Sequence, residues 1–186
     1  MSILAPARRP TSTRPESTTA IQKDLELSAI ELFQAYGLQG TRASSAMLPA
    51  DGSETVVAVI GFAAQHARGA LVLSATVSSA SHWLKAIAGP EVTASACDVI
   101  GEIANMLLGR LKSKLAEKGL NVLMSTPTAG QGAVAEIAPN GTSSWMAFQG
   151  EGWGLAVRVD VEFDESFRWQ ETLATSPAAP GDLMIF

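Results

Sequence analysis

The clearest pattern in the chain is a strict alternation of apolar with small or charged residues near its C-terminal end. Its apolar members are Trp153, Leu155, Val157, Val159, Val161 and Phe163. A period of two sends successive side chains to opposite faces of a strand. We therefore expect residues 153–163 to form a strand with one face on the core and the other in water.

Three other segments carry apolar residues at helical spacing, three and four positions apart, which predicts amphipathic helices. Each is closed by a glycine, a residue that suits the C-terminal end of a helix. Ser78 or Ser79 would cap the second helix, and Pro90 would lie in the first turn of the third. The expected helices are residues 21–37, 78–88 and about 91–118, closed by Gly37, Gly89 and Gly119.

Short runs rich in β-branched and apolar residues predict the remaining strands. Residues 55–63 and 70–76 would form a hairpin with Arg68 and Gly69 in its turn, and further strands are expected at 120–126, 132–138 and 142–149. The order helix, hairpin, helix, long helix, strands predicts an α/β (α+β) fold, with an antiparallel or mixed sheet covered by helices.

The ends of the chain are rich in proline, serine and threonine and poor in residues that could build a core. We expect residues 1–19 to be a disordered N-terminal tail and 169–186 a flexible C-terminal tail, because such compositions bury too little apolar surface to fold. Residues 20–168 would then form the single folded domain.

Composition and charge argue against several classes of function and site. The net charge is -5 and no block of Lys and Arg stands out, which argues against nucleic-acid binding. The single cysteine, Cys97, permits no internal disulfide and predicts a buried, inert thiol in a cytoplasmic protein. No apolar run approaches about 18 residues, so no membrane span is expected. His66 and His82 lack companion ligands, so we predict no metal site.

The long predicted helix carries a polar stripe. With about 100° of rotation per residue and Asp98 at zero, Glu102 lies near 40°, Asn105 near -20° and Gly109 near 20°. Solvated residues commonly occupy such a face. However, asparagine is a poor helix former and a mid-helix glycine costs roughly 1 kcal/mol relative to alanine, so their pairing here suggests function. The apolar residues that centre opposite, near 200°, are Ile100, Ile103, Ala104, Leu107 and Leu111.

Residues 98–127 resemble the CheC/CheX family of chemotaxis phosphatases, and the CheX branch most closely. The family pattern is an acidic residue or serine, three residues, Glu, two residues, Asn, and a proline after the next strand. This chain reads DVIGEIAN at 98–105, then MLLGRLKSKL, and a strand that ends at Pro127. The resemblance implies a CheC/CheX-like single domain with pseudo-symmetric halves.

The resemblance implies a function in signal termination, in chemotaxis or related two-component signalling: hydrolysis of the aspartyl phosphate of a CheY-like response regulator. Asn105 would orient the attacking water, and Glu102 would accept a hydrogen bond from a lysine of the partner. Asp98 would support Glu102 or contact the partner, with Gly109 and Pro127 on the same docking surface. The protein would need no cofactor of its own, because Mg²⁺ would sit in the phosphorylated receiver domain.

Two other functions stay open from the sequence. A non-catalytic adaptor could dock receiver domains or flagellar-switch components through the same helix, and a fold relative could have drifted to ligand sensing. The Asn105 amide distinguishes the first alternative from catalysis: an exposed, rigid amide favours catalysis, whereas one that is hydrogen-bonded internally or covered by the first helix favours the adaptor.

The chain offers one clear motif where CheC-type members carry two. The first helix provides only Glu31-Leu32-Phe33-Gln34, in which Gln34 is one methylene longer than asparagine and its neighbours are typical of a packed helix. We therefore expect no second working site. A homodimer through sheet edges, using the strands of residues 132–163, is also open.

Overall fold

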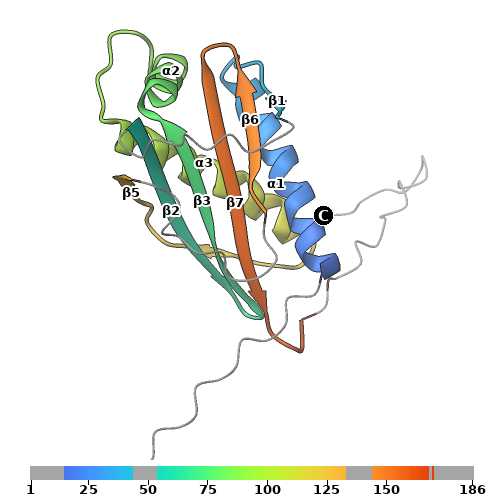
Figure 1. Ribbon diagram of the computed structural model, residues 1–186. Coiled ribbons are helices and arrows are strands. Elements are labelled where there is room, and N and C mark those ends of the chain that lie inside the picture. The colour runs from blue at the N-terminus through green and yellow to red at the C-terminus, as the bar shows by residue number, and fades with distance from the viewer. Residues whose placement is uncertain (1–14, 44–53, 133–143, 168, 170–186) are drawn as a thin grey trace, which may run out of the picture.

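The computed structural model of the chain describes residues 15–43, 54–132, 144–167 and 169. The helices of this part are α1 (Pro15–Ala35), α2 (Val77–Ala88) and α3 (Ala96–Glu117). Its strands are β1 (Thr41–Arg42), β2 (Thr55–Ala64), β3 (Ala67–Thr76), β4 (Leu123–Met124), β5 (Thr128–Gln131), β6 (Met146–Gly150) and β7 (Trp153–Phe163). They form one sheet in the order β1-β6-β7-β3-β2-β4, in which β5 also pairs with β2 (Figure 1). Every recorded pairing is antiparallel, which confirms the predicted α+β class.

The β2–β3 hairpin turns at Gln65 and His66, so the predicted turn at Arg68 and Gly69 is wrong. Gly69 instead lies within β3, opposite Phe62. A Cβ at this position would come within 2.2 Å of the Asp160 carbonyl oxygen on β7. The glycine therefore serves close strand packing, and its presence misled the turn prediction.

The alternation predicted for β7 is confirmed on its core side, where the apolar residues from Trp153 to Phe163 are buried. The opposite face is not open to water along its whole length. Arg158 is only 2% exposed, bonds to the Asp160 carboxylate at 2.9 Å and lies over the Trp145 ring at 4.9 Å. Ion pairing and ring stacking offset the cost of burying this guanidinium.

The folded part of the chain extends beyond the predicted boundaries at both ends. α1 begins at Pro15, inside the expected N-terminal tail, because proline lacks the N–H that a first helical residue leaves unused. At the other end Trp169 packs edge-on against Phe163 and Phe167, inside the expected C-terminal tail.

The starts of α2 and α3 also differ from prediction. α2 is capped by Thr76, not by Ser78 or Ser79, because the Thr76 hydroxyl accepts a hydrogen bond from the Ser79 N–H at 3.0 Å. α3 starts at Ala96 instead of about residue 91, with Ser95 as its cap, so Pro90 lies in a preceding turn.

Two strands are shorter or displaced. β4 keeps only residues 123–124 of the predicted 120–126, and β6 covers 146–150 instead of 142–149. The predicted strand at 132–138 lies outside the described residues apart from Gly132.

β6 and β7 are interior strands, because β1 pairs with the outer side of β6. β1 pairs with Phe148 and Gln149 of the five-residue β6, and residues 133–143 lie outside the described part of the chain, so a homodimer through residues 132–163 stays a prediction.

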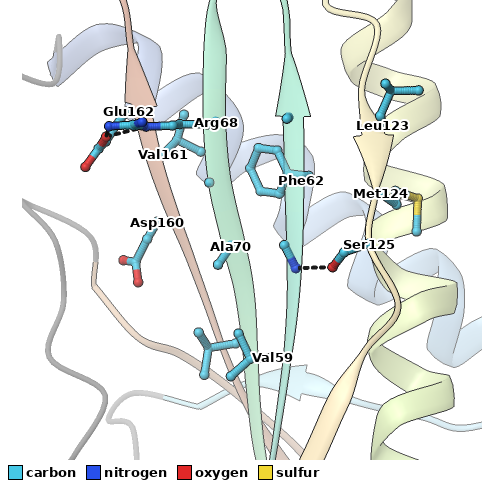
Figure 2. Close-up of a pocket in the computed structure, with 14 residues that line it drawn as sticks. Val59, Phe62, Arg68, Ala70, Leu123, Met124, Ser125, Asp160, Val161 and Glu162 are labelled. Atoms are coloured by element: carbon cyan, nitrogen blue, oxygen red, sulfur yellow. Dashed lines mark hydrogen bonds and ion pairs between the residues drawn. The ribbon is translucent and has the colours of Figure 1, made fainter.

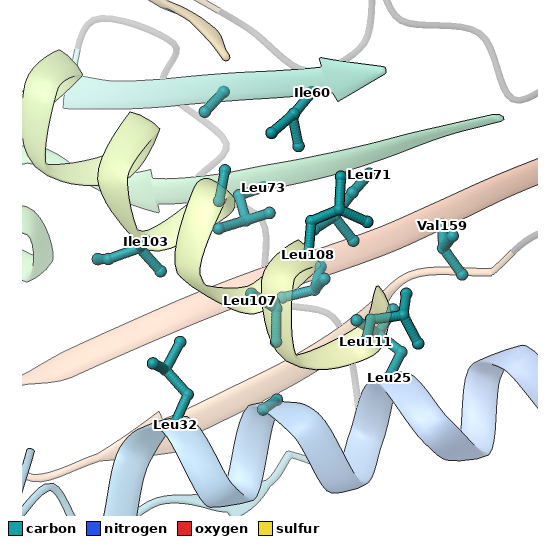
Figure 3. Close-up of a cluster of buried hydrophobic side chains, with 14 of the residues drawn as sticks. Leu25, Leu32, Ile60, Leu71, Leu73, Ile103, Leu107, Leu108, Leu111 and Val159 are labelled. Carbon is teal, nitrogen blue, oxygen red and sulfur yellow. The ribbon is translucent and has the colours of Figure 1, made fainter. Parts of the chain in front are cut away.

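The core lies between the sheet and the helices α1 and α3, which cover the same face of it (Figures 1 and 3). Two ion pairs join α1 to the C-terminal end of α3, Lys114–Glu31 at 2.7 Å and Lys118 with the buried Asp24. No helix in the described segments is long and apolar enough to cross a membrane. The fully buried residues at the centre include Leu25, Leu32, Ile60, Leu71, Leu73, Ile103, Leu107, Leu108 and Leu111.

Candidate functional site

The site begins with a reciprocal cap at the N-terminus of α3. The Ser95 hydroxyl accepts from the Asp98 N–H at 3.1 Å and donates to the Asp98 carboxylate at 2.6 Å, while the Ser95 N–H reaches the same carboxylate at 3.3 Å. This capping box satisfies donors that the first helical turn would otherwise leave without partners. Asp98 is therefore committed to holding the start of the helix, a role that its place in the polar stripe did not reveal.

The polar stripe faces outward along α3. Asp98, Glu102 and Asn105 are exposed, whereas the predicted core face of the same helix is fully buried. Gly109, one turn after Asn105, is partly exposed, and a Cβ placed there would meet no heavy atom within 4 Å. The helix surface beyond Asn105 is thus low and open, which would let a partner approach closely.

The carboxylate of Glu102 and the amide of Asn105 bond to no other group in the described part of the chain. Within residues 15–43, 54–132, 144–167 and 169, neither side chain has a hydrogen-bond or ion-pair partner, and α1 does not cover Asn105. The backbone beneath them is fixed, because Ile103, Ala104 and Leu107 are fully buried. An unpaired amide on an immobile helix can both donate and accept hydrogen bonds to an incoming group.

Contacts on both flanks hold this segment of α3 in place. Towards β5, α3 packs against the strand and Gly101 is buried in that contact, with room for no more than an ordinary van der Waals approach to Ala129. Towards α1, the Tyr36 hydroxyl donates to the sulfur of Met106 at 3.0 Å. Pro127 lies between β4 and β5, directly before the strand that flanks the helix, and is half-buried. Pro127 thus leads into the strand that packs beside α3.

The first helix offers no equivalent stripe. Its Glu31 carboxylate is taken by Lys114, and both Leu32 and Phe33 are buried. Gln34 is exposed and lines a shallow cavity of about 440 Å³ that also includes Gly37 and Gln149. The carboxylate and the amide of this half therefore do not form an outward pair like Glu102 and Asn105.

The chain matches the protein family described as chemotaxis phosphatase CheX. The match spans residues 56–149, just over half of the chain, and includes the whole of α2 and α3. The chain belongs to the CheX family. No sequence among curated proteins matches it.

Solved structures share the CheX fold with this chain. CheX from Vibrio vulnificus matches with a TM-score of 0.64 at 20% identity, covering 77% of this chain and 99% of that one. The CheX–CheY–BeF3–Mg²⁺ complex from Borrelia burgdorferi matches with 0.61 at 14%, covering 76% and 97%. A chain of the FliM–SpeE complex from H. pylori matches with 0.52 at 14%, covering 80% and 86%. At these identities the likeness establishes the fold alone.

The other reactive side chains of this CheX-family chain lie apart from the stripe or lack ligand geometry. In the described segments no group of three or more His, Cys, Asp or Glu residues is placed to hold a metal ion. Cys97 packs against the core but is only half-buried, which is less burial than the sequence predicted. At the β2–β3 turn, hydrogen bonds from Ser166 and then His66 lower the pKa of Asp164 below its usual 3.8.

A groove on the opposite face of the sheet was not foreseen from the sequence. It has a volume of about 770 Å³ and a floor of small and apolar residues that includes Val59 and Ala70 (Figure 2). Its rim carries the Arg68–Glu162 ion pair at 2.8 Å. Val59 points away from the face that its buried neighbours Ala58 and Ile60 share with α3, so the groove is separated from the stripe by the sheet.

Proposed function

We propose that this chain is a phosphatase that accelerates hydrolysis of the aspartyl phosphate of a CheY-like response regulator, in chemotaxis or related two-component signalling. The observation that carries the proposal is the outward pair of Glu102 and Asn105, exposed and unpartnered in the described chain, on a helix held by buried neighbours. Membership of the CheX family supports it, as does a relative crystallised with CheY, BeF3 and Mg²⁺.

The chemistry suits a side-chain amide. An acyl phosphate is already activated, so a protein nucleophile is not required. The oxygen of a water molecule attacks phosphorus, the bond to the receiver's aspartyl oxygen breaks, and phosphate and a carboxylate leave with the protons of the water on phosphate. The work left for this chain is to hold the water in line, which the Asn105 amide can do through one hydrogen bond. The receiver's Mg²⁺ would neutralise the charge that develops on the phosphoryl oxygens.

The neighbouring residues take supporting roles in this proposal. Glu102, one turn before Asn105, would accept a charge-assisted hydrogen bond from a lysine of the receiver and so fix the depth of docking. Asp98 would act through the capping box, by keeping the first turn of α3 in place. The open surface at Gly109 and the segment of Pro127, next to the strand that flanks α3, would accommodate the receiver.

A phosphorylated receiver provides the test. Its decay is followed with Mg²⁺, with and without the protein, for wild type, Glu102→Gln and Asn105→Ala. Asn121→Ala, a second exposed asparagine beyond the end of α3, is the matched control. We expect wild type and Asn121→Ala to accelerate decay, and Asn105→Ala to lose on the order of 100-fold of that acceleration, because the water is no longer held in line.

An adaptor that docks receivers or flagellar components through α3 without catalysis is the second candidate. The fold of this chain is similar to that of a chain of the FliM–SpeE complex, and this similarity favours the adaptor. Binding of at least one receiver without faster decay of any would establish the adaptor and refute the phosphatase.

A further inference from the structure

The C-terminal half of α3 is rich in cationic side chains, which differ in the side of the helix that they occupy and in whether they are paired. Lys114 and the capping residue Lys118 face α1 and form ion pairs there with Glu31 and Asp24. The charges of these two lysines are therefore already paired within the domain. Arg110 is half-buried and lies on the side of α3 towards α1, about 140° of rotation from Asn105.

Lys112 differs from the other three. It is exposed, and no residue of the described segments pairs with it. The positions three and four residues away hold Leu108, Gly109, Leu115 and Ala116, so its own helix supplies no acidic partner. Nothing in the described part of the chain therefore competes with a second molecule for the ammonium group.

Lys112 also lies on the same face as Asn105. Seven residues separate them, which places Lys112 within about 20° of Asn105 in rotation and roughly 10 Å further along the axis. The stripe between and beyond them carries the small residues Gly109, Ser113 and Ala116. A surface laid against Asn105 would thus rest on a low stretch of helix and meet Lys112 as its next long side chain.

The partner expected at Asn105 is anionic. It carries an acyl phosphate and a divalent cation, and such a cation is held by carboxylates. The first half of the stripe, with Asp98 and Glu102, is itself negative and would repel this surface wherever the partner has no lysine in reach. A cation on the same face supplies the missing attraction.

We propose that Lys112 is a second docking point, at which its ammonium group pairs with a carboxylate on the receiver roughly 10 Å from the phosphorylated aspartate. This assignment rests on the proposed function, because it takes the receiver as the partner. It makes Lys112 a residue that sets the affinity and choice of receiver, and leaves the chemistry to Asn105.

The test is receiver dephosphorylation by Lys112→Glu and Lys112→Arg at low ionic strength. Lys23→Glu, at an exposed lysine of α1, is the control with the same change of net charge. We expect Lys112→Glu to raise KM by about 5- to 10-fold with kcat within about 2-fold, because it places like charges opposite each other at the rim of an interface. Lys112→Arg should restore KM, and 0.5 M salt should shrink the difference, since exposed charge pairs are screened.

Affinity for the BeF3-loaded receiver separates the two proposals. If wild type binds without hydrolysing and Lys112→Glu weakens binding by a similar factor, the docking role stands and the phosphatase does not. If wild type hydrolyses and Lys112→Glu keeps the wild-type KM, or Lys23→Glu raises KM equally, the docking role is refuted alone. A wild-type protein that neither binds nor hydrolyses any receiver overturns both.

Discussion

The substitution Asp98→Ala tests whether Asp98 stabilises the start of α3 or contacts the partner. In Asp98→Ala the carboxylate that accepts hydrogen bonds from the Ser95 N–H and hydroxyl is lost, while the Ser95 oxygen still accepts from the N–H of residue 98. The change also removes a negative charge from the positive end of the helix dipole. Both groups are exposed, so water can replace part of what is lost.

The magnitude follows from these contacts. The two hydrogen bonds that the Asp98 carboxylate accepts contribute about 0.5–1 kcal/mol at this exposed site, and an acidic residue in the first turn contributes about 0.3–1 kcal/mol. We expect Asp98→Ala to lower the free energy of unfolding by about 1–1.5 kcal/mol, or Tm by roughly 2–6 °C for a domain of this size. Because the two halves of the box depend on each other, the double variant with Ser95→Ala should cost about 0.5 kcal/mol less than the sum of the single variants.

Urea unfolding followed by far-UV circular dichroism measures these differences. Glu102→Ala is the matched control: Glu102 is an exposed acid on the same stripe with no described partner, and its loss should stay within about 0.5 kcal/mol. An Asp98→Ala protein as stable as wild type, with a receiver KM raised tenfold or more, would refute the capping role and make Asp98 a partner contact.

Three further predictions concern packing, surface shape and pH. Leu107→Ala removes a fully buried side chain and should lower the free energy of unfolding by about 2–5 kcal/mol in urea. Gly109→Ala should raise the free energy of unfolding by up to about 1 kcal/mol, because the added Cβ meets open space. Gly109→Trp should raise the receiver KM, because the large ring fills the space that the receiver would occupy. Asp164→Asn should lower Tm near neutral pH, and the difference should vanish as pH falls well below 3.8, because a carboxylate whose pKa is lowered by Ser166 and His66 stabilises the fold only while ionised.

Local periodicity was enough to predict the features that repeat along the chain. The alternation in β7 and the opposition of polar and apolar faces on α3 both follow from backbone geometry, so the burial of Ile103 and Leu107 and the exposure of Asn105 could be read directly. The sequence also contains the signal for the start of α3, because Ser95 followed three residues later by Asp98 has the spacing of a capping box. The predicted start was too early because Pro90 was assigned to the first turn of the helix.

Features that depend on distant residues could not be predicted. Gly69 is a glycine because Asp160 of another strand lies against it, and Arg158 is buried because Trp145 covers its guanidinium. That Lys112 has no partner among the described residues likewise required the structure. Lys114 and Lys118 look equivalent to it in the sequence, and only the packing of α1 against α3 shows that those two are already paired.

The deciding experiment is the single-turnover decay of a phosphorylated receiver at saturating protein, with binding of the BeF3-loaded receiver measured in parallel for wild type and Asn105→Ala. If the Asn105 amide orients the water, the variant should bind within a few-fold of wild type yet decay on the order of 100-fold more slowly than the wild-type complex. A variant that binds normally and hydrolyses at the wild-type rate would contradict the proposal that Asn105 carries the catalysis.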